Sequence, residues 1–322
     1  MWTRSLRAAG RSQRTLDAYT EDVDMLTLHR GGIEPGKNVH RPSTAATLRS
    51  QQPIEDATRG DIEAFLVWCR DVRGLADATI ARRFRSLQQF YGWLHDHGEI
   101  ESNPMAKMKP PKVVDSPPPI IADDDMAKLI EACAGKLSDG GVRRKVTKSG
   151  RSPIDDFEIR RDTALVEIMR TTGVRCAEVM NLAVADVNLD AGTFRVVGKG
   201  NRIRTIALVG TARSALDSYL LSRRRHNRSD HPALWLSRKG PLSHSGLAQM
   251  LRRRCEDAGI GRINPHAFRH TFAHHAKVAG MTDESLMAVA GWQSPQMLHR
   301  YGRSASEERA QAEHRRLFGS ES

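Results

Sequence analysis

The chain has 322 residues, of which 39% are hydrophobic and 5% aromatic, and its net charge at pH 7 is +12. This length favours two folded domains of roughly 100–200 residues each. No apolar run approaches the roughly 20 residues that cross a bilayer, so we expect neither a membrane span nor a secretory signal. The four cysteines are widely spaced, which argues against a zinc site or a disulfide framework and favours the reducing cytoplasm.

Positive charge is concentrated in the second part of the chain. Residues 1–112 carry a net charge of +3 and residues 113–322 a net charge of +9, with basic clusters at 143–148, 223–225 and 252–254. A polyanion is the simplest partner for such clusters, because each neutralised phosphate releases condensed counterions. A solvated helix face explains any single cluster equally well.

Three amphipathic helices are predicted within the first hundred residues. The first covers residues 15–30, the second begins at the capping box Thr58-Arg59-Gly60-Asp61, and the third covers residues 78–95. Together they predict a small helical domain with a core of its own. A DNA contact is predicted for the basic face of the third helix, which is formed by Arg82, Arg83 and Arg85.

Prolines mark a boundary after these helices. Asn103-Pro104 ends the helical pattern and five further prolines follow, which favours an extended linker that begins at about residue 103. We therefore place the first domain in residues 1–112 and the second in residues 120–322. A helix is expected over 123–134. The glycine-rich segment 135–153 is predicted to be a mobile insertion that contacts DNA backbone phosphates through Arg143, Arg144, Lys145 and Lys148.

The second domain is predicted to be mostly helical with one antiparallel hairpin. Two helices, at 157–172 and 176–182, precede strands at 193–197 and 203–208, and the turn sequence Gly198-Lys199-Gly200-Asn201 joins the strands. Further helices are expected over 211–225, 245–258, 267–279, 283–290 and 295–301, followed by a polar tail helix near 305–318. The predicted fold class is thus mainly α with a small antiparallel β-sheet.

Short segments of the second domain follow one another in an informative order. In chain order they contain Arg175, Glu178, Lys199, His266, Arg269, Trp292 and Tyr301. Arg175 follows a helix that stops at a glycine, Lys199 occupies the hairpin tip, and Tyr301 lies nine positions after Trp292. This order and spacing resembles the tyrosine recombinase family, the phage integrases and the Xer- and Cre-like enzymes, over about residues 11–318. The resemblance implies a helical core-binding domain followed by a catalytic domain.

Phosphodiester chemistry explains why these residue types occur together. A phosphorus under attack becomes pentavalent and gains negative charge on its non-bridging oxygens, which the permanently charged Arg175 and Arg269 are suited to bind. The resemblance implies that Tyr301 attacks this phosphorus and leaves a 3′-phosphotyrosyl bond and a free 5′-hydroxyl. Because the ester is kept rather than hydrolysed, a second 5′-hydroxyl rejoins the strands without ATP, metal or another cofactor.

The resemblance also implies roles for the remaining residues. Lys199 gives a proton to the leaving 5′-oxygen, and Arg202 is a nearby competitor for this role and a predicted DNA contact. His266 accepts or organises the tyrosine proton. Trp292 replaces a commoner histidine, and its indole N–H can donate to a phosphate oxygen but cannot shuttle a proton. Glu178 orients the neighbouring side chains.

The partner implied by the resemblance is double-stranded DNA with inverted core-type sites. Four protomers would act on two duplexes and pass through a Holliday junction. The tail helix, about residues 304–318, would then dock on a neighbouring protomer. A phage or mobile-element integrase and an Xer-like resolvase are both open at this stage.

Other interpretations are weighed against this one. Taken singly, the residues are ordinary: a surface arginine, a hairpin lysine, an N-cap histidine, a half-buried tyrosine. A type IB topoisomerase uses similar chemistry, but the spacing from Trp292 to Tyr301 and the helical first domain disfavour it. A DNA-binding protein without activity is disfavoured by the intact residue set. A metal site at His270, His274 and His275 lacks the glutamate of the H-E-x-x-H zinc pattern.

Overall fold

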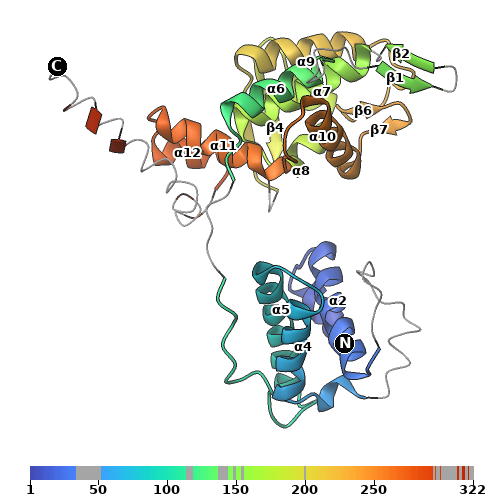
Figure 1. The fold of residues 1–322 in the computed structure, drawn as a ribbon, viewed down its shortest axis with the longest axis vertical. Helices are drawn as coiled ribbons and strands as arrows, with labels where there is room; N and C mark the ends of the chain where they lie inside the picture. Colours follow the sequence, from blue (N-terminus) through green and yellow to red (C-terminus); the bar gives the residue numbers. More distant parts are fainter. Residues whose placement is uncertain are drawn as a thin grey trace. The chain divides into compact units, whose positions relative to one another are not determined.

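The computed structural model describes residues 1–33, 52–113, 119–136, 156–198 and 201–292, the backbone of 144–147 and 150–153, and single positions beyond 292. The chain divides into two compact units, Met1–Ser116 and Pro117–Ser322 (Figure 1). Both are built mainly from helices, and the second holds the short antiparallel strands, so the predicted fold class is confirmed. Within these described parts, no helix combines the length and the apolar character that crossing a membrane requires.

The first unit is a helical bundle. Its elements are α1 (Trp2–Ala8), α2 (Gln13–Arg30), the 3-10 turn η1 (Ile54–Asp56), α4 (Arg59–Asp71) and α5 (Asp77–Asp96). The predicted stripe on α4 is buried, with Ile62 and Phe65 in the core beside Phe84 of α5. Helix α1 was not predicted. It is held by tertiary packing, because Trp2 lies edge-on against Phe90.

The predicted capping box at the start of α4 is confirmed. The Thr58 hydroxyl accepts from the Asp61 amide at 3.2 Å, and the Asp61 carboxylate accepts from the Thr58 amide at 2.8 Å.

Replacing an N-cap threonine by alanine removes this acceptor, so Thr58→Ala should lower the free energy of unfolding by about 1 kcal/mol in urea denaturation. The control is Thr3→Ala, at an exposed threonine inside α1. Equal losses in both variants would contradict the prediction.

The arginine face predicted for the third helix, now α5, is wrong at Arg83. This side chain is 6% exposed, and its guanidinium lies 6.0 Å from the Phe65 ring centroid. It lies three positions after Ile80, on the apolar face of the helix. Arg82 donates to both carboxylate oxygens of the fully buried Asp22, at 2.6 and 3.0 Å. Arg85 is the exposed residue of this predicted trio.

The segment after α5 still packs on the first unit. Met105 is fully buried in its core, and its amide donates to the Asn103 side chain at 2.8 Å. Met108 is partly buried against the same core. The first residues of the predicted linker therefore belong to the packed bundle.

The second unit has a helical core built around α7 (Asp156–Thr172). This helix packs on α6, α9 and α11 (Figure 1), and Leu165 and Ile168 are fully buried in it. The other helices are α6 (Asp123–Cys133), α8 (Cys176–Met180), α9 (Gly210–Arg223), α10 (His244–Ala258), α11 (Pro265–Val278) and α12 (Asp283–Ala290). Each matches a predicted helix, with ends that differ by a few residues. The predicted helices at 295–301 and 305–318 fall almost wholly outside the described residues.

The predicted hairpin is part of a three-stranded antiparallel sheet, β3 (Val187–Asn188), β4 (Thr193–Val197) and β5 (Ile203–Ala207). Phe194 pairs with Ile206, and Val196 pairs with Arg204. Phe194, Val196 and Ile206 are buried against the helical core. Arg204 therefore lies on the same, core-facing side of the sheet.

Five short strands were not predicted: β3 and the four strands of two further antiparallel pairs. The pairs are β1 (Arg144–Thr147) with β2 (Gly150–Pro153), inside the predicted insertion, and β6 (Leu236–Ser237) with β7 (Gly240–Pro241). Strands of two to four residues are too short for an alternating pattern to be recognised in the sequence.

Candidate active site

Three arginines from different elements converge on the last turn of α12. Each donates to one of three consecutive carbonyls. The pairs are Arg204 Nε with Val289 O at 3.0 Å, Arg269 Nη2 with Ala290 O at 2.7 Å, and Arg175 Nη2 with Gly291 O at 2.9 Å. The last carbonyls of a helix lack intrahelical partners and carry partial negative charge, which favours cations. The end of α12 therefore gathers three guanidiniums into one place.

Arg175 is placed by a sharp joint between α7 and α8. Gly173 adopts a φ of +59°, and a Cβ there would lie 2.3 Å from Cδ1 of Phe272, so only glycine fits. The chain then turns so that Arg175 becomes the N-cap residue of α8. Its side chain is 35% exposed and donates from Nη1 to Glu178 at 2.9 Å.

Glu178 is the anion of the cluster, and its side chain is 5% exposed. Its carboxylate accepts two hydrogen bonds from Arg175, from the amide and from Nη1, both at 2.9 Å. It accepts two more from Arg204, from Nη1 at 2.9 Å and from Nη2 at 2.8 Å. Burial by itself would raise the pKa of this carboxyl. The hydrogen bonds and charges of the two arginines outweigh burial and lower the pKa to about 2. Glu178 is therefore ionised at neutral pH.

Arg269 lies deeper, with 4% of the residue exposed. It also donates from Nη1 to the Gly173 carbonyl at 2.9 Å, and its Cζ lies 5.1 Å from the Trp292 ring centroid. Trp292 is buried in a small cluster with residues of α11 and α12. One turn before Arg269, His266 is exposed on the first turn of α11. The N-cap there is Asn264, whose side chain accepts from the His266 amide at 3.0 Å, so the N-cap interpretation of His266 is wrong.

A cavity of about 560 Å³ opens beside two of these arginines, Arg175 and Arg204. Its lining residues are Arg175, Gly198, Arg202, Ile203, Arg204, Met287, Ala288, Gly291, Trp292 and Ser294. Of the predicted residues, the structure thus brings together Arg175, Arg202 and Trp292 around one cavity. Glu178 is hydrogen-bonded to Arg175, and Arg269 is hydrogen-bonded to the Ala290 carbonyl at the end of α12. Arg204 was not predicted. The sequence did hold a signal for it: Arg204 lies two positions before the apolar Ile206, and residues two apart in a strand share one face of the sheet.

Some predicted residues lie outside the described parts of the chain. They are Lys199, Tyr301, Arg143 and Lys148. For Arg144 and Lys145 the structure describes the backbone of β1 and not the side chains. Their predicted roles therefore stay predictions.

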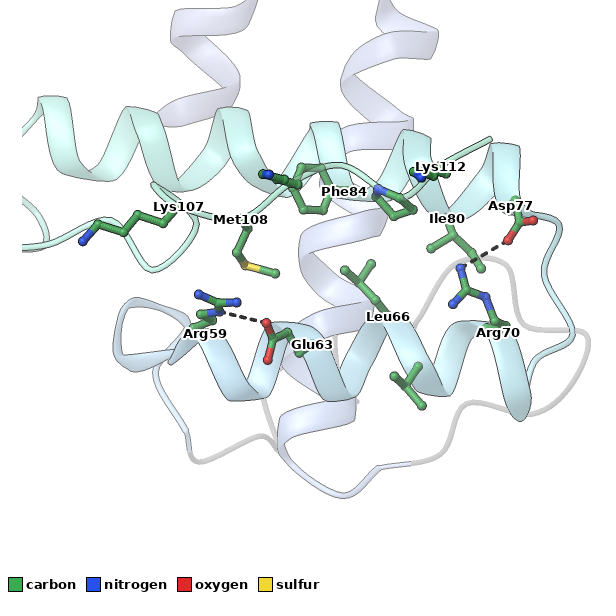
Figure 2. A pocket seen from close by; sticks show the side chains of 13 residues that line it. Arg59, Glu63, Leu66, Arg70, Asp77, Ile80, Phe84, Lys107, Met108 and Lys112 are labelled. Atoms are coloured by element: carbon green, nitrogen blue, oxygen red, sulfur yellow. Dashed lines mark hydrogen bonds and ion pairs between the residues drawn. The ribbon is translucent and has the colours of Figure 1, made fainter. Parts of the chain in front are cut away.

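A larger cavity, of about 930 Å³, lies in the first unit (Figure 2). Figure 2 shows apolar side chains among those that line it, including Leu66, Phe84 and Met108. Its charged rim is partly paired, through Arg59 with Glu63 at 2.8 Å and Arg70 with Asp77 at 3.2 Å. The residues predicted to act in catalysis all belong to the second unit, so we do not place the chemistry at this cavity.

Known proteins share both sequence and fold with this chain. The family model described as "Phage integrase family" matches residues 153–308. Tyrosine recombinase XerC of Roseiflexus castenholzii is 31% identical over 241 residues, 73% of this chain and 71% of the relative. Tyrosine recombinase XerC of Neisseria meningitidis serogroup B is 30% identical over 293 residues, 87% of both chains. A lambda integrase tetramer bound to a Holliday junction has the same fold, with a TM-score of 0.64 and 18% identity over 93% of this chain and 74% of that one. The chain belongs to the phage integrase family and is a tyrosine-type site-specific recombinase.

Proposed function

We propose that this recombinase cuts and rejoins DNA with Tyr301 as nucleophile and with Arg175 and Arg269 as the cations that stabilise the phosphorane. The observation that carries the proposal is the convergence of Arg175 and Arg269 on the end of α12, next to Trp292 and a cavity. Arg175 donates two of its five N–H groups, to Glu178 and to the Gly291 carbonyl, which leaves donors for phosphate oxygens. Preorganised donors of this kind often supply the greater part of an enzyme's rate enhancement.

The proposed reaction balances without metal or ATP. The Tyr301 oxygen forms a bond to phosphorus, the bond from phosphorus to the 5′-oxygen breaks, and Lys199 gives that oxygen a proton. His266, exposed one helical turn before Arg269, takes the proton of the phenol. A 5′-hydroxyl of the partner strand then attacks the 3′-phosphotyrosyl bond and releases Tyr301. Trp292 donates a hydrogen bond to a phosphate oxygen, and Arg202, which lines the cavity, binds DNA.

The proposed partner is double-stranded DNA with inverted core-type sites, bound by four protomers on two duplexes. The fold shared with a lambda integrase tetramer on a Holliday junction supports this assembly. The first unit, residues 1–112 with its linker, would bind core DNA through exposed groups such as Arg85. The unit from residue 120 onward would carry the chemistry and exchange its tail, about 304–318, with a neighbour. The four free cysteines agree with a cytoplasmic location.

The test is capture of the covalent intermediate. A duplex with a nick just beyond the scissile phosphate loses the short 5′-hydroxyl fragment after cleavage, so the protein stays bound to DNA. We expect an adduct that survives denaturation, with the DNA attached to the peptide that contains Tyr301 in mass spectrometry. No adduct on the cognate site would overturn the proposal. Vigorous relaxation of supercoiled DNA without a cognate site would favour a topoisomerase instead.

A further inference from the structure

We propose that Arg204 is a positioning residue of this active site. It holds Glu178 and the end of α12, and its charge offsets that of Glu178, so that the charge of Arg175 stays uncompensated and available to the phosphate. The inference rests on the proposed function, because it assumes that Arg175 binds the scissile phosphate. It gives a part in the reaction to a strand residue that the sequence pattern alone did not single out.

The first argument is the place of Arg204 in the sheet. The residue lies on the core-facing side of β5, opposite Val196 of β4, and its side chain is 16% exposed. Turning a guanidinium toward the core is costly unless its donors are satisfied. Three of its five N–H groups are used, two on the Glu178 carboxylate and one on the Val289 carbonyl. These three bonds tie the guanidinium to its protein neighbours, Glu178 and the end of α12.

The second argument is the tight fit between Arg204 and the α12 turn. Gly291 ends α12 with a φ of +64°, and a Cβ there would lie 2.9 Å from Cζ of Arg204. At the base of the hairpin, a Cβ on Gly198 would lie 3.6 Å from Nη1 of Arg204. The guanidinium is therefore packed between the hairpin base, Glu178 of α8 and the turn that leads to Trp292. One side chain ties these three elements together.

The third argument is the charge balance. Arg175, Arg204 and Glu178 together carry a charge of +1, available to an incoming phosphate. Without Arg204, the remaining pair of Arg175 and Glu178 is neutral, and Glu178 keeps only Arg175 as a described partner. Arg175 is then compensated by a carboxylate before DNA arrives. The loss of Arg204 should therefore slow the chemical step more than it weakens DNA binding.

The experiment compares variants in single-turnover cleavage of the nicked duplex at saturating protein. Arg204→Gln should lower the cleavage rate by about 10²-fold, as expected when a reacting group is misplaced, and change DNA affinity in fluorescence anisotropy less than about threefold. Arg204→Lys keeps the charge and should stay within about tenfold of the wild-type rate. Arg195→Gln is the matched control, since Arg195 is an exposed arginine of β4 that pairs with Asp186 at 3.4 Å.

A double variant separates positioning from general damage. In Arg204→Gln combined with Glu178→Gln, Arg175 recovers its uncompensated charge, so cleavage should be several-fold faster than in Arg204→Gln alone. A purely structural role makes the double variant slower than either single variant. A wild-type rate in Arg204→Gln, or a double variant no faster than Arg204→Gln, would overturn the proposal. Failure of the wild-type protein to form any adduct would instead overturn the proposed function. Arg204→Lys decides the question if Arg204→Gln does not fold.

Discussion

Arg269→Ala is expected to lower the rate of DNA strand cleavage by about 10³-fold. The change removes a permanent charge from the proposed phosphate site, and losing one preorganised donor typically costs about 10²–10³ in rate. It also takes the guanidinium donor from the carbonyls of Gly173 and Ala290 and the cation from the face of Trp292. The rate is measured as adduct formed over time on the nicked duplex, with protein in excess of DNA.

The control for this prediction must separate lost chemistry from lost stability, because Arg269 is buried. Arg223 is a matched residue: it is also buried and donates to backbone carbonyls, those of the loop that ends at Leu234, away from α12. Arg223→Ala should destabilise the fold in urea and yet cleave within about tenfold of the wild-type rate at a temperature where it is folded. Tyr301→Phe, which lacks the nucleophile, gives the background. Cleavage by Arg269→Ala within tenfold of wild type would contradict the proposed role.

Local patterns account for what the sequence predicted correctly. The Thr58 capping box and the i, i+3, i+4 stripes of α4 and α5 involve residues within one or two turns of one another, so a single sequence carries them. The candidate site was found differently, from residue types in a known order. The structure places Arg175 and Arg269 on adjacent carbonyls although they lie 94 positions apart in the chain.

Long-range partners account for what was missed. The position of Arg204 is set by its hydrogen bonds to Glu178, 26 positions away, and to Val289, 85 positions away. No short window of sequence contains all three residues. Arg83 was assigned to the wrong face because its charge was given more weight than its spacing from Ile80. It is stabilised inside the bundle by a buried carboxylate from α2, which the pattern of α5 alone does not reveal. Helix α1 likewise depends on an aromatic contact with α5.

Acid should remove stability that Glu178 contributes. The pKa of this carboxyl is about 2 in the folded chain, well below its ordinary value of 4.5, because the bonds from Arg204 and Arg175 outweigh burial. A depressed folded-state pKa means that the unfolded chain binds the proton first as pH falls. The contribution is therefore complete above about pH 5.5, declines below that pH as the unfolded chain takes up its proton, and is lost near pH 2. Its full size is about 3 kcal/mol, at about 1.4 kcal/mol for each pH unit between the two values.

Glu178→Gln isolates this contribution from that of the other carboxyls. The glutamine cannot titrate, so the difference in free energy of unfolding between wild type and variant should be largest at pH 7 and shrink as pH falls toward 3. Urea unfolding at a series of pH values measures this difference, because all other acids titrate alike in both proteins. Parallel stability curves would mean that the carboxylate gains nothing from its arginines in the folded state. Stability curves that converge at low pH would mean that the ion network of Arg175, Glu178 and Arg204 is already formed before DNA binds. Folding, and not the substrate, then supplies the geometry of this network.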